Sequence, residues 1–302
     1  MAKASVLGGK KIKAKDFGST HHRSLNRSVG GDICVYLLLF VVGVFMALPL
    51  VYTILQSFKP LDELWIFPPR FYVVNPTPDN YTDLFQLMGT SWVPFSRYIF
   101  NTVFISVVGT AGNVLFSSLA AYAISKINFP GRNFLFSVIV YSLMFNSTVT
   151  AITMFITMSL LKWIDTYYAI IVPAFCTTFG LYLMRQFMDT SVPNEVLESA
   201  RLEGAGELRI FWKIAMPMVK PAWITLIIFA FNGLWNTGAS IYIYSEQLKT
   251  FNYAISQIVT GGIARSGASS AAQVISMIVP IVVFAITQSN VIQTMSSSGL
   301  KN

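Results

Sequence analysis

Residues 195–217 read EVLESARLEGAGELRIFWKIAMP and lie between two long apolar stretches of the chain. In the first half, Val196, Leu197 and Ala200 share one face at helical spacing, while the charged side chains lie off that face. Two glycines then permit a sharp turn, because glycine tolerates backbone angles that other residues avoid. The apolar period restarts at Ile210, and prolines end it before the next apolar stretch. The segment therefore predicts a charged, amphipathic helix–turn–helix.

The rest of the chain has the composition of an integral membrane protein. Hydrophobic residues make up 54% of the 302 residues and charged residues only 11%, with a mean hydropathy of +0.59. Six uncharged stretches can each supply the ~20 residues that a helix needs to cross the hydrocarbon core. They are residues 33–57, 98–125, 133–161, 166–184, 221–245 and 271–294. We predict an all-α polytopic membrane protein with six transmembrane helices in residues 31–302, after a disordered basic tail over residues 1–30.

The positions of the basic residues predict how the chain is oriented. If the N-terminus is cytoplasmic, 15 of the 21 Lys and Arg residues fall in cytoplasmic segments, as the positive-inside rule requires. Both termini and the charged segment near residues 191–220 are then cytoplasmic. The net charge of +8 follows from this distribution and from the basic tail. We interpret it as an orientation signal with weak attraction to anionic membrane lipid, and we expect no nucleic-acid partner.

The sequence lacks the residues that several classes of function need. The interiors of the six apolar stretches hold no Asp, Glu, Lys or Arg, which ion-coupled carriers usually need. No G-x-x-x-x-G-K-[ST] phosphate loop, HExxH motif or nucleophile–base–acid arrangement occurs, so we expect no enzyme activity and an energy source on another polypeptide. Cys34 and Cys176 lie within apolar stretches, and two thiols make no metal site, so neither a metal nor a cofactor is expected.

The charged segment also carries a recognisable order of residues. It contains Glu198-Ser199-Ala200, then Gly204, and it closes on Ile214-Ala215-Met216-Pro217. This order resembles the EAA loop of ABC importer permeases, in which Glu-Ala-Ala precedes a glycine and then Ile-x-x-Pro. Ser199 replaces the usual Ala, and Glu203 stands where Asp is common. The resemblance implies the MetI-like permease fold and makes residues 191–220 the loop that binds a separate ATPase subunit.

The same resemblance implies roles for individual residues of the loop. It assigns ATPase coupling to Leu197, Glu198, Ser199, Ala200, Glu203, Gly204, Ile214 and Pro217. Glu198 is expected to form a salt bridge with a basic residue of the ATPase, while Leu197 and Ala200 pack into its groove. Gly204 is expected to set the bend between the two helices. An alternative interpretation of the segment is a surface helix that lies on lipid headgroups.

Further motifs occur along the rest of the chain. They are Phe67-Pro68-Pro69-Arg70, Ala120-Ala121-Tyr122-Ala123-Ile124-Ser125, Phe129-Pro130-Gly131-Arg132 and Trp235-Asn236, although Thr237 follows where Asp is frequent. They are similar to the carbohydrate branch of these permeases, in particular to the maltose-importer type. The resemblance implies a location in the cytoplasmic membrane of a prokaryote. It also implies a carbohydrate substrate, a second permease subunit, ABC ATPase subunits and an extracytoplasmic sugar-binding protein.

Two segments would face that binding protein. Phe58–Arg97 is rich in proline and aromatic residues, and its stretch Asp79–Leu87 predicts a short helix. Glu246–Ser270 contains Thr260-Gly261-Gly262 and Ser266-Gly267, which allow it to bend closely around another surface. As the resemblance implies, the first segment forms part of the landing surface and the second helps to dislodge the sugar.

Polar residues inside the apolar stretches form two stripes that are candidates for a substrate pathway. Asn146, Thr150 and Thr153 share one side of the third predicted span, and Asn232, Trp235 and Asn236 share one face of the fifth. An indole beside two carboxamides suits a sugar, because it offers an apolar plane together with hydrogen-bond donors and acceptors. The alternative is helix packing, since Thr often bonds its own helix and Asn often joins helices.

Two other functions stay open at this point. The loop motif is shared across ABC importers, so a permease for a non-sugar solute such as peptides is one alternative. A membrane scaffold that translocates nothing is the other. The sugar assignment depends on the flanking motifs and on the uncharged, aromatic-bearing stripes.

Overall fold

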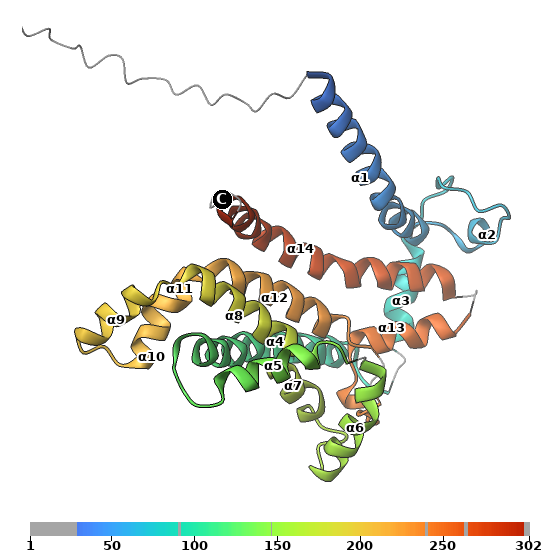
Figure 1. Ribbon diagram of the computed structural model, residues 1–302. Coiled ribbons are helices and arrows are strands. Elements are labelled where there is room, and N and C mark those ends of the chain that lie inside the picture. The colour runs from blue at the N-terminus through green and yellow to red at the C-terminus, as the bar shows by residue number, and fades with distance from the viewer. Residues whose placement is uncertain (1–28, 90–91, 146, 239–240, 263–264, 299–302) are drawn as a thin grey trace, which may run out of the picture. The chain divides into compact units, whose positions relative to one another are not determined.

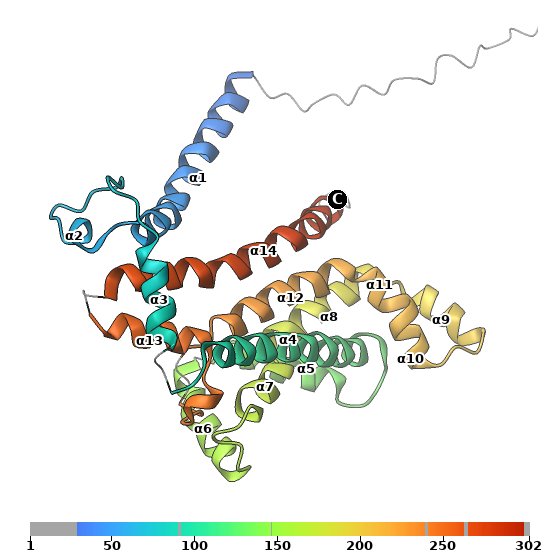
Figure 2. The same cartoon turned by 180° about the vertical axis from the view of Figure 1, so that it is seen from behind.

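The computed structural model describes residues 29–89, 92–145, 147–238, 241–262 and 265–298, and these residues form helices and connecting segments without a strand. The longer helices are α1 (Val29–Ser57), α3 (Asp79–Gly89), α4 (Phe95–Lys126), α5 (Arg132–Ser142), α6 (Ser147–Leu160), α7 (Tyr168–Phe175), α8 (Thr178–Ser191), α9 (Asn194–Leu202), α12 (Lys220–Trp235), α13 (Phe251–Thr260) and α14 (Ser266–Ser298). The shorter ones are α2 (Leu61–Leu64), α10 (Glu207–Ile210), the π-helix η1 (Phe211–Ala215), α11 (Met216–Met218) and the 3-10 helix η2 (Glu246–Leu248). Figures 1 and 2 show their arrangement. The all-α prediction is confirmed.

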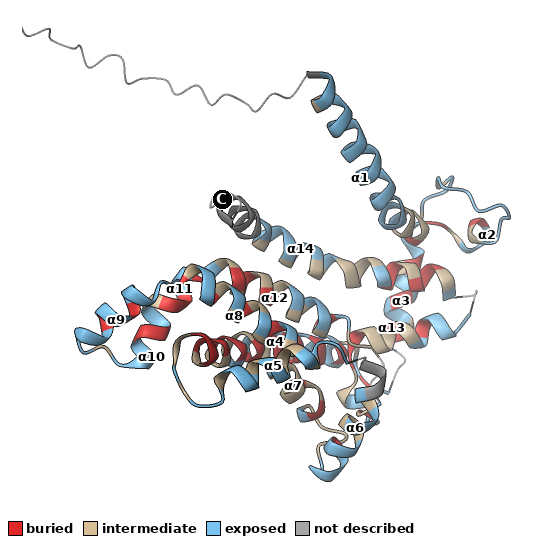
Figure 3. Ribbon diagram, in the orientation of Figure 1, coloured by how far each residue is buried: buried red, intermediate tan, exposed pale blue. Residues whose placement is uncertain are grey.

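Most of α1 belongs to a separate compact unit that ends at Val51. Apart from Asp32, its residues 30–51 are uncharged and mostly apolar, and none of them is buried (Figure 3). Exposed Leu, Val and Phe side chains all around a helix are typical of a surface that lipid covers. The tail predicted to be disordered lies outside the described residues except at its end, where α1 begins at Val29.

In the second unit, Tyr52–Asn302, α4 is the central helix, and it packs against α7, α8 and α12. Small residues allow this close approach. A Cβ on Gly109 would lie 2.5 Å from the Leu234 side chain of α12, and a Cβ on Gly112 would meet the Phe175 ring of α7. The row of small and polar residues on this helix therefore packs helices together.

The predicted membrane spans agree with the structure only in part. Within the described ranges, four helical segments are long and apolar enough to cross a membrane: residues 30–57, 95–126, 168–191 and 266–288. A fifth is obtained only if residues 207–218 and 220–235, which are bent by 82°, are counted as one span. The predicted number of six is therefore not reached among the described residues.

Two of the predicted spans are shorter or broken for local reasons. The helix in the third predicted span, α5, ends at Ser142. There the amides of Leu143 and Met144 donate to carbonyls three residues back and tighten the last turn. A separate helix, α6, follows. The fifth ends at Trp235 because the side chains of Asn236 and Thr237 bond carbonyls of the preceding turn, and residues 236–238 and 241–245 are not helical.

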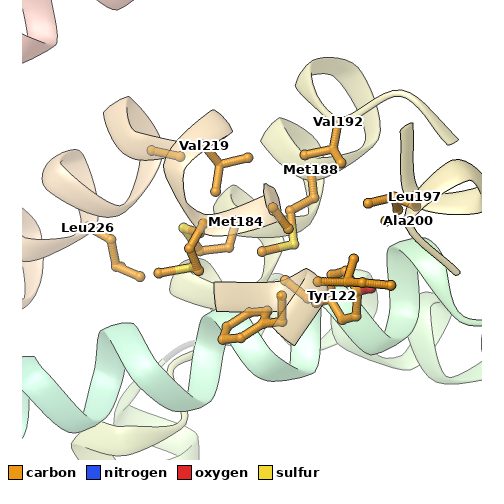
Figure 4. Close-up of a cluster of buried hydrophobic side chains, with 14 residues drawn as sticks. Tyr122, Met184, Met188, Val192, Leu197, Ala200, Val219 and Leu226 are labelled. Carbon is orange, nitrogen blue, oxygen red and sulfur yellow. The ribbon is translucent and has the colours of Figure 1, made fainter. Parts of the chain in front are cut away.

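The buried side chains of the second unit form two clusters. One cluster lies between α4, α8, α12 and the segment that carries α9 to α11, and includes Met184, Met188, Leu197, Phe211 and Leu226 (Figure 4). The other joins the N-terminal end of α4 to α3, α13 and α14 through Leu84, Tyr98, Phe251, Ile255 and Ala271. The predicted helix over residues 79–87 is confirmed by α3, which packs its apolar face into the second cluster.

Candidate functional site

The charged segment folds into a helical hairpin, defined here as α9, its turn and the second leg α10–η1–α11. The turn has the geometry of a Schellman motif, in which Gly204 donates to the Arg201 carbonyl at 3.0 Å and Ala205 donates to the Ala200 carbonyl at 3.0 Å. Gly204 has φ +80°, a left-handed backbone that favours glycine. The turn therefore depends on this glycine, whereas Gly206 has an ordinary φ of −71°.

One face of α9 is buried against its own chain. Leu197 is 1% exposed and Ala200 is 9% exposed, and both belong to the cluster that contains Met188, Val192 and Phe211 (Figure 4). This burial differs from the expectation that the two side chains enter a groove of a partner. The reason is that the apolar stripe of an amphipathic helix packs on the nearest available core, which here is the core of the chain itself.

The opposite face of α9 is free of the chain. Glu198 and Ser199 are exposed, and Leu202 has 90% of its surface exposed at the end of the helix. Glu203 and Gly204 follow on the exposed turn. A carboxylate and a large apolar side chain next to each other form a surface that can meet both a basic group and an apolar patch of another protein.

The second leg contains an irregular helix and a sharp bend. The residues Phe211–Ala215 form a π-helix, a rare element that often marks functional sites. Ile214 is half-buried against the same cluster, and Pro217 is exposed in α11. The chain then turns by 82° into α12, which has Pro221 in its first turn, where a missing N–H is tolerated.

Polar side chains near the C-terminal end of α4 hold the hairpin. Tyr122 donates a 2.8 Å hydrogen bond to Oε2 of Glu207, whose Oε1 lies 2.7 Å from Nε of Arg201. Lys126 donates to the Val192 carbonyl at 2.7 Å and to Oδ1 of Asn194 at 3.0 Å. Ser125 donates to the Asp189 carboxylate, which also pairs with Arg185 at 3.2 Å. The hairpin is thus tied to α4 at its beginning and at its second leg.

The sequence analysis missed this set of residues. Tyr122 and Ser125 stand in a quoted motif, but the motif contributed only to the family resemblance. A usable signal was present, since Tyr122, Ser125 and Lys126 are spaced i, i+3 and i+4 at the end of an apolar stretch and therefore share one face. The partner of Tyr122, Glu207, is not predictable from spacing, because the two residues are 85 positions apart along the chain.

The N-terminal end of α4 holds the segment 246–251 in a similar manner. Asn101 donates to the carbonyls of Gln247 and Lys249 at 2.8 Å each, and Tyr98 donates to Oε1 of Glu246 at 2.7 Å. Burial disfavours the charge of Glu246, but hydrogen bonds from Lys249 and Tyr98 outweigh it and keep the pKa of this carboxyl below its usual value. The segment is therefore held by both its backbone and its side chains.

The described pathway candidates come from two parts of the chain, α6 and the C-terminal end of α12. Asn146 lies outside the described residues. Thr150 and Thr153 are exposed on α6, and Asn232 and Asn236 are exposed on α12, where the Asn236 amide donates 2.6 Å to Oδ1 of Asn232.

Trp235 is placed differently from the two asparagines near it. It is 5% exposed, stacks on Phe231 and donates its indole N–H to the Ser276 carbonyl of α14 at 3.0 Å. The Trp235 carbonyl accepts a 2.8 Å bond from the Asn252 amide. These contacts give the tryptophan a packing role between α12, α13 and α14. Among the described residues, no group of three His, Cys, Asp or Glu is placed to hold a metal ion.

The architecture defines a class of protein: an all-helical membrane protein with a charged hairpin between two apolar helices. The chain belongs to the family of binding-protein-dependent transport system inner membrane components, whose model matches residues 112–297. It is therefore an inner membrane component of a transport system.

Named relatives agree with this membership. Protein LplC of Bacillus subtilis is 34% identical over 68% of this chain and 67% of the relative. The arabinooligosaccharides transport system permease protein AraQ of Halalkalibacterium halodurans is 33% identical over 62% of this chain and 66% of the relative. The sn-glycerol-3-phosphate transport system permease protein UgpE of Yersinia pestis is 29% identical over 86% of this chain and 94% of the relative. The chain thus spans about two thirds of the first two relatives.

A solved structure shows the same fold. It is a crystal structure of a bacterial ABC transporter involved in the import of the acidic polysaccharide alginate. The match has a TM-score of 0.74 and 23% identity, and covers 88% of this chain and 99% of the other. At this identity the likeness establishes the ABC permease fold alone.

Proposed function

We propose that this chain is the permease subunit of an ATP-driven, binding-protein-dependent importer of oligosaccharides or other carbohydrates. The observation that carries the proposal is the hairpin, which buries one face in its own bundle and presents Glu198 and Leu202 on the other. Such a part is suited to receive force from another protein and pass it to the bundle. The relatives named for arabinooligosaccharide transport and for polygalacturonan and rhamnogalacturonan transport support the carbohydrate class.

The hairpin would act as a lever on the bundle. In this mechanism the exposed face of α9 docks on an ABC ATPase subunit, and Glu198 pairs with a basic residue there. Closure of the ATPase dimer on ATP then displaces α9, while Leu197 and Ala200 keep it attached to the bundle. The distribution of Lys and Arg supports a cytoplasmic hairpin with both termini on the same side.

The remaining partners would complete the transporter around this chain. A second permease subunit pairs with it, and an extracytoplasmic sugar-binding protein delivers the substrate to segments 58–97 and 246–270. A related crystal structure is a bacterial alginate ABC transporter in complex with an alginate pentasaccharide-bound periplasmic protein, which supports this arrangement by analogy of fold. We propose that the substrate pathway is lined by four polar side chains that are exposed on this chain: Asn232, Asn236, Thr150 and Thr153. Asn146 also stays a candidate.

Reconstitution tests the transport claim directly. The chain would be purified with the co-encoded permease and ATPase subunits, placed in proteoliposomes with the binding protein, and offered arabinooligosaccharides, oligogalacturonates, sn-glycerol-3-phosphate and a peptide mixture. ATP-dependent uptake of a carbohydrate supports the proposal. Uptake of peptides alone moves the chain to a non-sugar importer, and an assembly that hydrolyses ATP without moving any of these solutes supports the scaffold alternative.

A substitution series tests the lever. We expect Glu198→Lys to keep the chain in the membrane and to lower ATP-driven uptake by at least about tenfold, because losing an interfacial ion pair and placing a like charge there costs more than about 1.4 kcal/mol. Glu198→Gln, which removes the charge but keeps the size, should fall between wild type and Glu198→Lys. Normal ATPase co-purification and uptake in both variants would refute the docking role of Glu198.

A further inference from the structure

Tyr122 occupies a special position near the C-terminal end of α4. Its side chain is only 4% exposed. The hydroxyl contacts a polar partner, and the ring contacts an apolar one. The hydroxyl donates to Oε2 of Glu207 at 2.8 Å, and the ring meets Phe211 edge-on, with centroids 5.5 Å apart and an interplanar angle of 65°. Glu207 is the first residue of α10 and Phe211 the first of η1, so one side chain of α4 contacts both parts of the second leg.

The second leg needs such contacts because it does not support itself. The helix α10 has four residues, the π-helix after it has five, and α11 has three. Helices of this length are unstable in isolation, and their position is set by tertiary packing. Tyr122, together with the buried Ile210 and Ala215, supplies that packing.

The Glu207 carboxylate also links the second leg to α9. Arg201 of α9 reaches both of its oxygens, with Nε at 2.7 Å from Oε1 and one terminal nitrogen at 3.4 Å from Oε2. The two-nitrogen geometry fixes the orientation of the carboxylate. Arg201, Glu207 and Tyr122 therefore form a continuous polar connection from α9 through the second leg to α4.

We infer that Tyr122 is a positioning residue that makes the second leg of the hairpin and α4 move as one body. This inference rests on the proposed function and assigns the point at which the lever enters the bundle. A displacement of α9 passes through Arg201 and Glu207 into α4, the helix with the most extensive packing in the second unit. Without the Tyr122 hydroxyl, the second leg loses its hydrogen bond to α4 and can shift against that helix.

A double-mutant cycle on the full-length purified chain in detergent tests the connection itself. The variants are Tyr122→Phe, Glu207→Gln and their combination, with thermal unfolding as the measurement. Tyr122→Phe keeps the ring against Phe211 and removes only the hydroxyl. We expect the melting temperature of the double variant to fall by less than the sum of the two single falls, because both remove the same hydrogen bond. Additive falls would overturn the connection.

Tyr182→Phe is the matched control for this cycle. Tyr182 lies on α8, and its ring stacks on Phe136, away from the hairpin. Combined with Glu207→Gln, it is expected to give additive shifts. Non-additivity as large as that of Tyr122→Phe would mean that the cycle reports a general effect of removing tyrosine hydroxyls, which would also overturn the inference.

A second experiment measures the motion in the assembled transporter, with MgATP and vanadate as the probe. Spin labels are placed at Arg209 of α10 and Val107 of α4, both exposed, after Cys34 and Cys176 are replaced by Ala. In the wild type we expect the label-to-label distance distribution to keep its position and width when the nucleotide is trapped. In Tyr122→Phe we expect it to shift or broaden on trapping, while ATP hydrolysis persists and Tyr182→Phe behaves as wild type.

The outcomes separate the two claims. An unchanged, narrow distribution in Tyr122→Phe would overturn the positioning role and leave the importer proposal intact. Failure of the wild-type chain to co-purify with any ATPase would instead remove the importer proposal. The unfolding cycle would still decide whether Tyr122 and Glu207 are energetically coupled.

Discussion

The two ends of α4 carry the same arrangement of residues but hold their partners differently. At the N-terminal end the side chains are Tyr98, Asn101 and Thr102, and at the C-terminal end they are Tyr122, Ser125 and Lys126, both spaced i, i+3 and i+4. Each tyrosine donates to a glutamate that is paired with a basic residue, Glu246 with Lys249 and Glu207 with Arg201. The N-terminal end, however, mainly binds backbone groups, because Asn101 donates to two carbonyls and Thr102 accepts the Phe251 amide at 2.8 Å.

This difference suits two mechanical roles. A bond to the backbone fixes the path of the chain, and Asn101 and Thr102 are 0% and 1% exposed, so water does not compete for these groups. The ion pair at the other end has side chains that are 37% and 45% exposed, and such pairs adjust easily because they contribute little free energy. We therefore interpret the N-terminal end as a fixed anchor. We interpret the C-terminal end as a joint, in which Tyr122 keeps the second leg with α4 and the exposed Arg201–Glu207 pair is the weaker contact.

The largest expected effect tests the anchor. Asn101→Ala removes two donated hydrogen bonds and one accepted from Tyr167, and should lower the free energy of unfolding by about 3 kcal/mol because three part-buried partners are left unpaired. Ser125→Ala at the joint removes one bond to a partly exposed carboxylate and should cost about 1 kcal/mol. Thermal unfolding in detergent measures both. Equal costs would remove the distinction between the ends.

The next effect concerns the turn at Gly204, between α9 and the second leg of the hairpin. Gly204→Ala forces a side chain into a left-handed backbone and should destabilise the chain by about 1–2 kcal/mol, although a Cβ there meets no neighbour. Gly206→Ala is the matched control, because its φ of −71° is ordinary and its Cβ is also unobstructed. It should be neutral or stabilise by about 0.5 kcal/mol. A turn that tolerates both substitutions equally would show that its geometry is not fixed by Gly204.

A smaller effect distinguishes the two ion pairs by their response to salt. Arg201→Ala should cost about 0.5 kcal/mol at low ionic strength and almost nothing near 1 M NaCl, where the screening length falls to about 3 Å. Lys249→Ala should keep most of its cost, because Lys249 also donates to the Tyr253 hydroxyl at 2.7 Å and is 15% exposed in its side chain. Melting temperatures at the two salt concentrations give the comparison. A larger salt response for Lys249→Ala would reverse the assignment of anchor and joint.

The smallest expected effect is a loss of thermal stability at low pH that depends on Asp165, which binds the segment before the anchor. Hydrogen bonds from the Ser245 hydroxyl and amide, and from the Tyr244 amide, lower the pKa of Asp165 below its ordinary value of 3.8. A carboxyl whose folded pKa is depressed adds stability above its unfolded pKa, and this contribution disappears as the pH falls through the folded value. Melting temperatures measured downward from about pH 5 should therefore fall less steeply in Asp165→Asn than in wild type. Identical slopes would exclude Asp165 as a contributor.

Some features were predictable because they depend on residues close together in the sequence. The hairpin follows from an apolar period interrupted by Gly204, and α3 follows from a period over residues 79–87. Family membership was also predictable, since the motif residues lie within one short segment, and the family match confirms it. In each case the physical signal is complete within about twenty residues.

Other features were not predictable because long-range packing decides them. A run of uncharged residues fits a span, but it does not show where hydrogen bonds to side chains end the helix, as they do after Trp235. The pathway assignment of Trp235 assumed that polar residues on one face share one environment. In the structure its indole N–H bonds Ser276, 41 residues away, while Asn232 and Asn236 on the same helix are exposed.

The sequence by itself determined that this chain combines uncharged apolar stretches of membrane-spanning length with a charged, glycine-bent hairpin, because composition and periodicity are local properties. The tertiary structure decided which side of the hairpin is available to a partner. From the sequence, the apolar Leu197 and Ala200 of α9 could pack either on a partner protein or on the core of this chain. The structure places Met188 and Phe211 in the same cluster, so the chain itself covers them. The tertiary structure also decided that α4 holds the hairpin, since the contact between Tyr122 and Glu207 exists only after the helices have packed.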